Sequence, residues 1–214
     1  MINDEHLENY ILEHIDEEGR HLKKVNRDTY VKLLRPRMCS GHLQGRILNM
    51  ICQLVRPRYI LELGTFSGYS ALCMAESLAD DPLAELHTID IDDELEEFAS
   101  SNFENSEYGD KIHLHIGDAI EIIPTIDRIF DVVFIDANKR IYSEYYDLVF
   151  DKVRKGGLII ADNTLWDGKV IQDPLPKDAQ SVGILNFNDK IKNDDRVEKV
   201  ILPLRDGMTL IRKK

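Results

Sequence analysis

Five short apolar runs alternate with segments of helical periodicity, and this alternation constrains the fold more than any other feature of the chain. The runs are Tyr59–Leu63, Leu86–Ile91, Lys111–Ile116, Phe130–Ile135 and Leu158–Ala161. Strands separated by helices form βαβ units with right-handed crossovers, which build a parallel sheet with helices on both faces. The sequence therefore predicts an α/β fold with a doubly wound, mostly parallel sheet.

The C-terminal part departs from this alternation. A helix is predicted over Val182–Ile191, followed by two strands over Val197–Leu204 and Met208–Arg212. Asp206-Gly207 between the two strands is a hairpin signal. We therefore expect a seven-stranded sheet that has at least one antiparallel strand at its C-terminal end.

Helical patterns precede the first strand. Apolar residues at helical spacing predict a helix over the first thirty-odd residues, ended near Arg35-Pro36. A second helix is predicted from about Leu43 to Val55, with a glycine-punctuated turn between the two. At 214 residues the chain has the length of one domain, which we divide into N-terminal helices covering the site (residues 1–55) and a core (residues 56–214).

Charge and cysteine content narrow the classes of function. A net charge of −12 argues against a general affinity for nucleic acid or anionic membranes, and no run approaches the roughly 18 apolar residues of a membrane span. Cys39, Cys52 and Cys73 lack metal-ligand spacing and are typical of reduced core thiols. The acidic segment at residues 1–10 is unlike a secretory signal. We expect a cytoplasmic protein.

Two neighbouring apolar runs end abruptly in acidic residues. Asp136 follows Phe130–Ile135, and Asp162 and Asn163 follow Leu158–Ala161. Because parallel strands point the same way, these side chains are expected at one rim of the sheet, where ligands bind in open α/β folds. The sequence predicts a working site at this rim.

The first strand runs into a glycine-containing turn that leads into a helix, Glu62-Leu-Gly64-Thr-Phe66-Ser-Gly68-Tyr69-Ser70. Such a turn brings a ligand close to the backbone and to a helix N-terminus. Phe66 and Tyr69 replace two glycines of the dinucleotide fingerprint, so a nucleoside without a diphosphate fits better than NAD or FAD. A tight turn without a ligand is the alternative.

Two further acidic residues follow strands. Asp90 ends the second strand about 20 residues beyond the glycine turn, where a carboxylate can accept both ribose hydroxyls. Asp118 precedes Ala119 after the third strand, where it could accept from an adenine amino group. Both residues are also good helix N-caps, as is Asp92.

Taken together, this pattern resembles the class I S-adenosylmethionine-dependent methyltransferases. More narrowly, it is similar to the cation-dependent O-methyltransferases that include catechol and caffeoyl-CoA O-methyltransferases and their bacterial relatives. The resemblance covers roughly residues 35–212. Its signature pieces are Arg37-Met38-x-Ser40-Gly41, Leu61-Glu62-Leu-Gly64-Thr-x-x-Gly68-Tyr69-Ser70, Ile135-Asp136-Ala-Asn138-Lys139 and Asp162-Asn163-Thr-Leu-Trp166-x-Gly168.

The resemblance implies a role for each matching residue. It implies a divalent cation, Mg²⁺ or Ca²⁺, held by Asp136, Asp162 and Asn163, and a general base or substrate-orienting group in Lys139. Positions that bind the methyl donor S-adenosylmethionine correspond to Met38, Ser40, Glu62, Gly64, Phe66, Ser70, Asp90, Asp118, Ala119 and Asp136. Relatives are commonly homodimers, so a homodimer is expected.

The chemistry of the residues supports the cation site. Two carboxylates and an amide oxygen are hard ligands that suit Mg²⁺ or Ca²⁺ and leave positions open for water and substrate. A substrate with two adjacent oxygens could chelate the ion, which would lower the pKa of the hydroxyl that attacks the methyl group. Lys139 could accept the proton if the cation depresses its pKa. Trp166 either stacks on a planar substrate or packs under the following loop.

Several alternatives remain open at this point. Some bacterial relatives methylate a hydroxylated uridine in transfer RNA, and a local basic rim could form from Arg35, Arg37, Lys139, Arg140 and Lys169. A non-catalytic nucleotide-binding module is a third reading. Many relatives carry Asp-Ala-Asp-Lys where this chain has Asn138 as the third residue. The seven histidines lack the paired spacing of metal motifs, and no role is assigned to them.

Overall fold

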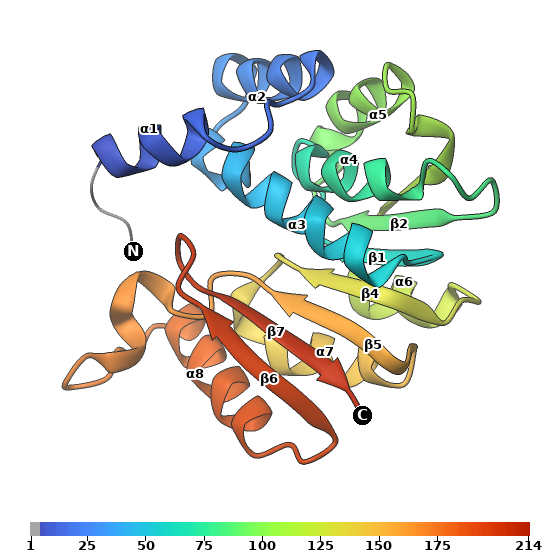
Figure 1. Ribbon diagram of the computed structural model, residues 1–214. Helices are drawn as coiled ribbons and strands as arrows, with labels where there is room; N and C mark the ends of the chain where they lie inside the picture. Colours follow the sequence, from blue (N-terminus) through green and yellow to red (C-terminus); the bar gives the residue numbers. More distant parts are fainter. Residues whose placement is uncertain (1–4) are drawn as a thin grey trace.

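The computed structural model describes residues 5–214 (Figure 1). Residues 1–4, part of the acidic segment and of the predicted first helix, lie outside the described residues. A seven-stranded sheet runs through the molecule in the order β3-β2-β1-β4-β5-β7-β6. The strands are β1 (Tyr59–Leu63), β2 (Glu85–Asp90), β3 (Ile112–Ile116), β4 (Phe130–Ile135), β5 (Val153–Ala161), β6 (Val197–Leu202) and β7 (Met208–Lys213).

Strand direction follows the prediction. β3, β2, β1, β4 and β5 pair in parallel, and β7 pairs antiparallel with both β5 and β6. The order reverses at β1, which lies between β2 and β4 and so forms the switch point where α/β folds bind ligands. The predicted mostly parallel, doubly wound sheet with a C-terminal hairpin is confirmed.

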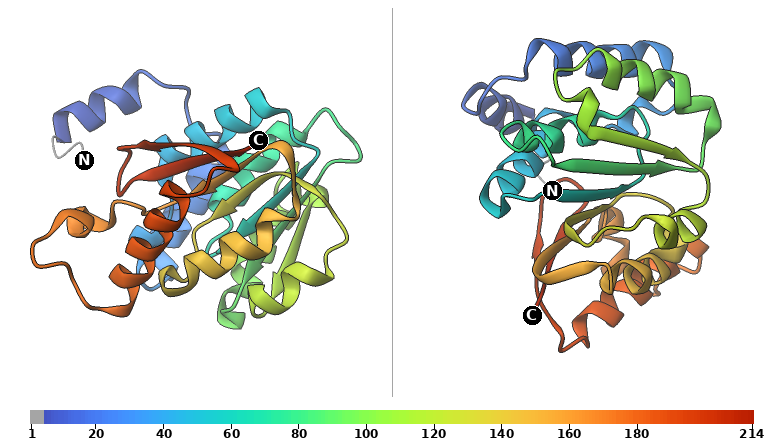
Figure 2. Two further views of the ribbon diagram at one scale, coloured as in Figure 1. Left: turned by 90° about the horizontal axis from the view of Figure 1, so that it is seen from below. Right: turned by 90° about the vertical axis from the view of Figure 1, so that its right-hand side faces the viewer.

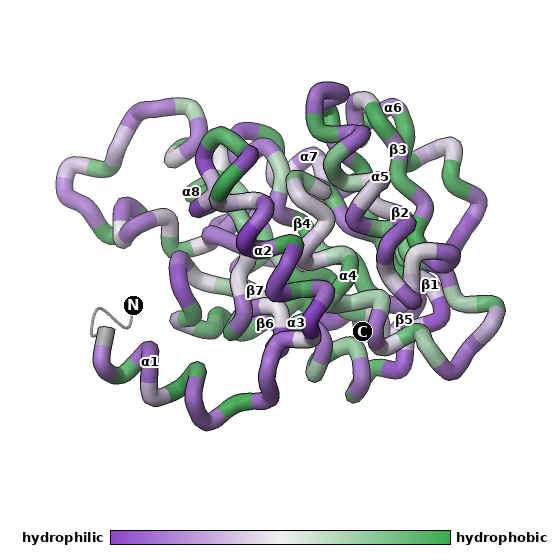
Figure 3. Tube along the Cα trace, turned by 90° about the horizontal axis from the view of Figure 1, so that it is seen from above, coloured by the Kyte–Doolittle hydropathy of each residue, from purple (hydrophilic) through white to green (hydrophobic). Residues whose placement is uncertain are grey.

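Helices pack on both faces of the sheet (Figures 1 and 2). One face carries a core shared with α2, α3, α4 and α5, and the other a core shared with α6, α7 and α8. α2 is mostly hydrophilic along its length and buries only Leu22, Val25 and Thr29 (Figure 3). The helices are α1 (Glu5–Glu13), α2 (Arg20–Lys32), α3 (Gly41–Val55), α4 (Tyr69–Ala75), α5 (Glu96–Glu104), α6 (Ala119–Ile122), α7 (Tyr142–Phe150) and α8 (Ala179–Lys192).

The first predicted helix is in fact two helices. Residues 14–19 separate α1 from α2, because tertiary contacts hold this segment out of a helix: His42 Nε2 lies 2.7 Å from the Asp16 carbonyl, and the Tyr69 hydroxyl donates to Glu18. Gly19, in an extended conformation, then precedes α2. Local periodicity predicted the helical faces but carried no signal for these long-range contacts.

The predicted second helix begins earlier than expected, at Gly41. Gly45 lies inside α3 and faces α4. A Cβ atom at this position would lie 2.7 Å from Cys73 Sγ and 2.9 Å from Tyr69 Cε1. The absence of a side chain at Gly45 is what lets α3 and α4 approach closely.

Burial of the three cysteines agrees with the sequence. Cys39, Cys52 and Cys73 are free thiols in the core. Within residues 5–214, no helix combines the length and the apolar character needed to cross a membrane.

We predict that Gly45→Ala destabilises the protein by about 1–3 kcal/mol, because the added methyl group overpacks a filled helix contact. Gly19→Ala is the matched control, since nothing lies within 4 Å of a Cβ atom there and φ is −57°. Urea unfolding followed by circular dichroism measures both. Equal stability of the two variants would show that the α3–α4 contact relaxes without cost.

Candidate active site

The carboxyl ends of the five parallel strands lie along one rim of the sheet. The residue after each strand continues the hydrogen-bond ladder to its neighbour: Gly64 N donates to Ile89 O, Asp136 N to Leu63 O, and Asp162 N to Ile135 O, at 2.8–3.0 Å. Gly117 N likewise donates to Asp90 O at 2.8 Å. The glycine turn, Asp90, Asp136 and Asp162 therefore lie along a single edge, as the strand pattern predicts.

The glycine turn lies directly against the end of β4. A Cβ atom at Gly64, where φ is +99°, would lie 2.3 Å from the Asp136 carbonyl oxygen. Backbone this close leaves room for glycine alone, and the positive φ independently favours glycine. The turn that was predicted to approach a ligand and the first acidic residue of the rim are thus in contact.

Asp136 and Asp162 form a carboxylate pair at adjacent strand ends. The Lys139 ammonium donates to Asp136 Oδ1 at 2.6 Å, and the Gln44 amide donates to Asp162 Oδ2 at 2.9 Å. Burial, and then the charge of Asp136, raise the pKa of Asp162 to about 6. A positive charge beside this pair would therefore favour the ionised form of Asp162.

Lys139 is nearly enclosed at this rim. Burial alone would lower its pKa, but the Asp136 carboxylate and then the Tyr142 hydroxyl outweigh burial, so that its pKa lies above its usual value. In this arrangement Lys139 is a charged donor. The Tyr142 hydroxyl also donates to both Ile135 O and Asp162 O at 3.2 Å, which ties the ends of β4 and β5 together.

The residues after Asp162 adopt unusual backbone conformations. Asn163, Trp166 and Asp167 have positive φ values of 58°, 47° and 52°. The Trp166 indole donates to Ser181 Oγ at 3.0 Å and packs against the core under α8, and the Lys169 ammonium lies 5.4 Å from its ring centroid. These contacts are those of the packing alternative for Trp166, and its stacking on a substrate stays a prediction.

Glu62 is a fully buried carboxyl group on β1. The Ser70 hydroxyl donates to its Oε1 and the Thr88 hydroxyl to its Oε2, both at 2.6 Å. Burial is the dominant cause that raises its pKa to about 8, against the opposing effect of these two hydrogen bonds. Glu62 therefore connects β1 to α4 and to β2 beneath the glycine turn.

Asp90 holds the glycine turn from the neighbouring strand. Its Oδ2 accepts from Phe66 N at 2.7 Å and its Oδ1 from Asp92 N at 3.1 Å. The cap of the next helical turn is Asp92, which accepts from Glu94 N. Asp118 does act as an N-cap, accepting from Ile120 N at 2.9 Å, and the adjacent Ala119 is buried.

Two functional residues were missed in the sequence. Arg205 in the β6–β7 hairpin donates to the carbonyls of Arg37, Cys39 and Ser40 and to Gln44 Oε1. Gln44 in turn holds Asp162. Ser40 is buried beside this network, whereas Met38 is exposed. Since Arg205 lies about 160 residues from its acceptors, no local motif could have identified it.

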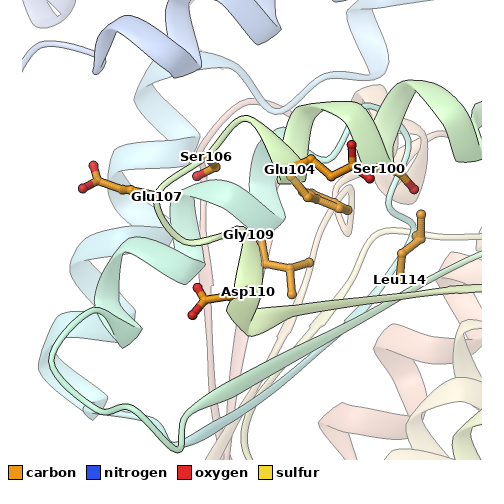
Figure 4. Close-up of a pocket in the computed structure, with 9 residues that line it drawn as sticks. Ser100, Glu104, Ser106, Glu107, Gly109, Asp110 and Leu114 are labelled. Carbon is orange, nitrogen blue, oxygen red and sulfur yellow. The ribbon is translucent and has the colours of Figure 1, made fainter.

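A surface pocket lies elsewhere, between α5 and the start of β3 (Figure 4). Glu104, Glu107 and Asp110 give it an acidic lining. Among the described residues that line it, none belongs to the predicted site. One lining residue, Phe103, nevertheless packs against Gly68 of the glycine turn.

Comparison with known proteins identifies the family. The O-methyltransferase family model matches residues 12–214. The chain belongs to the O-methyltransferase family. The predicted family resemblance is confirmed, and with it the prediction that the protein is an enzyme.

Relatives and solved structures agree with this membership. Caffeoyl-CoA O-methyltransferase 1 of Eucalyptus globulus is 33% identical over 186 residues, which cover 82% of this chain and 75% of that protein. The O-methyltransferase TomG from Streptomyces achromogenes, solved in complex with SAM, has a TM-score of 0.91 at 28% identity and full coverage of both chains. An O-methyltransferase from Bacillus cereus in complex with SAH has a TM-score of 0.89 at 26% identity, covering 98% of this chain and 97% of that one.

We predict that Glu62 makes the stability of this O-methyltransferase depend on pH. Because its pKa is raised in the fold, the stability it contributes is complete below its ordinary value of 4.5 and is lost as the pH rises through about 8. The free energy of unfolding should fall by at most roughly 1.4 kcal/mol per pH unit in this window. Glu62→Gln, which stays neutral, should flatten the slope. Parallel curves for the two proteins, measured by urea unfolding from pH 4.5 to 8, would contradict this.

Arg205 should order the segment that carries Ser40 and Gln44. We predict that Arg205→Gly, which suits the positive φ of 47° at this position, costs about 1.5–3 kcal/mol because charged hydrogen bonds are lost. Hydrogen exchange at residues 37–44 should accelerate. Arg212→Ala, which removes an exposed pair with Glu198, is the control and should leave this segment unchanged. Unchanged hydrogen exchange at residues 37–44 in Arg205→Gly would show that Arg205 does not hold this segment in place.

Proposed function

We propose that this O-methyltransferase transfers a methyl group from S-adenosylmethionine to a hydroxyl group of a small molecule with adjacent oxygens, assisted by a divalent cation. The single observation that carries the proposal is the carboxylate pair of Asp136 and Asp162, of which Asp136 is in backbone contact with Gly64. A site for a cation and a turn suited to a nucleoside lie side by side. The relatives solved with SAM and SAH support the choice of methyl donor.

The donor set fits a hard cation. Asp136 and Asp162 offer carboxylate oxygens at adjacent strand ends, and Asn163 offers an amide oxygen next in sequence. Burial first, and then repulsion from Asp136, raise the pKa of Asp162, and a bound cation would favour its ionised form again. When bound, Mg²⁺ or Ca²⁺ would supply the positive charge that favours ionisation of a substrate hydroxyl.

Other residues of the chain would position the methyl donor and the carboxylate of Asp162. The buried Glu62 and Asp90 brace the turn from below and from the side, so that Gly64 and Phe66 present a fixed backbone to the donor. Gln44 orients Asp162 through one carboxylate oxygen. If the donor and the substrate are held in a fixed geometry, the attacking oxygen is aligned with the methyl group when both are bound.

Lys139 is proposed as the catalytic side chain. While it is paired with Asp136 it is a charged donor that could orient a substrate oxygen. A divalent charge beside Asp136 would oppose the effect of that carboxylate on the Lys139 pKa, which would allow Lys139 to accept the substrate proton. Arginine could replace lysine as a charged donor that orients the substrate, but it could not replace lysine as a base.

Other predictions rest on the family and on the residues alone. The cytoplasmic location, the homodimer and a catechol-like substrate remain proposals. The relatives named above do not favour transfer RNA as a substrate, and the family match does not favour a non-catalytic module. Of the suggested basic rim, Lys139 is already paired with Asp136.

We predict that Asp162→Ala abolishes methyl transfer while the protein stays folded, because Asp162 lies at the rim rather than within the apolar core. Turnover is measured with labelled S-adenosylmethionine and a panel of vicinal dihydroxy aromatics, with Mg²⁺ and with chelator. Asp80→Asn, an exposed carboxylate away from the strand ends, is the matched control and should retain full activity. Equal turnover of the wild type in Mg²⁺ and in chelator would exclude the cation-assisted mechanism.

Lys139→Met should lower kcat by about 10²–10⁴, the usual contribution of a positioned acid–base group. Lys139→Arg keeps the positive charge but cannot act as a base near neutral pH. We expect it to be as impaired as Lys139→Met in single-turnover assays. Retention of most of the activity in Lys139→Arg would assign Lys139 an orienting role instead.

A further inference from the structure

Three histidines and a glutamate gather on the β2–β3 edge of the sheet, away from the rim. His87 on β2 is directly paired with His113 on the edge strand β3, and His115 pairs with Ile89 two positions further on. Because side chains alternate along a strand, Glu85, His87, His113 and His115 project from the same face. The strands that bring them together are labelled in Figure 3.

The side chains are close enough to share an ion. Potential ligand atoms of Glu85, His87 and His113 all lie within 4.8 Å of one another. His87 Nε2 lies 3.3 Å from Glu85 Oε2, and the His87 and His113 ring centroids are 4.9 Å apart. Glu85 and His87 are largely enclosed, whereas His113 is exposed, so its ring has room to turn toward the other two.

We propose that Glu85, His87 and His113 form a transition-metal site for Zn²⁺ or a similar borderline cation, distinct from the rim. Two imidazole nitrogens and one carboxylate oxygen are ligands typical of Zn²⁺, Co²⁺ or Ni²⁺, whereas Mg²⁺ and Ca²⁺ prefer oxygen alone. Three protein ligands leave one tetrahedral position for water. A metal at this site would cross-link the edge strand β3 to β2.

His115 supports the site from behind. Its Nε2 lies 3.0 Å from His87 Nδ1. If His87 donates its Nδ1 proton to His115, the Nε2 lone pair is left facing Glu85, which is the tautomer that a metal requires. Ligating histidines usually donate their other ring N–H in this way, and loss of such a partner typically weakens metal binding by about 10–100-fold.

Arg128 is the internal competitor of the metal. Its guanidinium donates to both oxygens of Glu85, at 2.9 and 3.1 Å, and lies over the Tyr59 ring. A cation must displace or share this interaction. Removal of the guanidinium should therefore strengthen metal binding. Adventitious binding to histidines that does not involve Glu85 would not respond in this way.

The two cation sites are separable in space and in chemistry. The cluster extends along β2 from Glu85 to His87, and Asp90 ends that strand, so about 10 Å of strand lies between His87 and the rim. Excess Mg²⁺ occupies hard oxygen sites and leaves imidazole ligands available. Zn²⁺ binding measured in excess Mg²⁺ thus reports on the cluster, independently of the proposed methyl transfer.

The test is a Zn²⁺ titration of the full chain without a histidine tag, in excess Mg²⁺, against a chromophoric chelator. We expect one Zn²⁺ per chain in the wild type, at least tenfold weaker binding in His113→Ala, 10–100-fold weaker binding in His115→Ala, and tighter binding in Arg128→Gln. His14→Ala, an exposed histidine stacked on Tyr10, should bind as the wild type does.

The outcomes are decisive in either direction. Tighter binding in an Arg128→Gln variant whose circular dichroism matches the wild type, together with loss in His113→Ala, supports the site; the circular dichroism control is needed because an unfolded chain would expose its three buried cysteines to Zn²⁺. Absence of Zn²⁺ binding in the wild type, unchanged binding in His113→Ala, or no gain in Arg128→Gln would overturn the proposal. Asp162→Ala should retain Zn²⁺ binding, and its loss there would place the metal at the rim instead.

Discussion

At the rim, the backbone of Gly64 lies against the carbonyl of Asp136, and the arrangement of the proposed functional groups depends on that approach. β1 and β4 are adjacent at the point where the strand order reverses, so their ends diverge into a turn on one side and an acidic loop on the other. A side chain at Gly64 would force them apart. Proximity between the turn proposed to bind the nucleoside and the carboxylate proposed to bind the cation is thus a property of the backbone.

Buried carboxyl groups at this rim oppose stability when they ionise. Glu62 and Asp162 both have raised pKa values, because burial disfavours their ionised forms. Hydroxyl and amide donors from Ser70, Thr88 and Gln44 offset part of that cost. Functional sites commonly retain groups whose charge the fold disfavours, since a ligand of opposite charge then binds more strongly. The buried apolar faces of the sheet stabilise the fold that holds them.

The sequence predicted the positions of residues that are set by the order and direction of the strands. It did not predict features that depend on contacts between segments far apart in the chain. The rim residues were predictable because parallel strands end on one side, and Asp136 and Asp162 each follow an apolar run. Three other features were not predictable: the break between helices at residues 14–19, the hydrogen bonds of Arg205, and the pairing of His87 with His113. Each arises from segments that local periodicity treats separately, although the alternation of His113 and His115 was a signal that those residues share a face.

Asn138 illustrates how a small departure from the family pattern acts through charge. Its Oδ1 accepts from Arg140 N at 3.2 Å, which caps the short helical turn that contains Lys139. An aspartate would cap this turn equally well, so the cap does not explain the asparagine. A carboxylate at 138 would, however, add a second negative charge beside the Lys139–Asp136 pair. With the neutral amide, the anion that pairs with Lys139 is Asp136, three residues earlier in the chain, and the negative charge stays at the ends of β4 and β5.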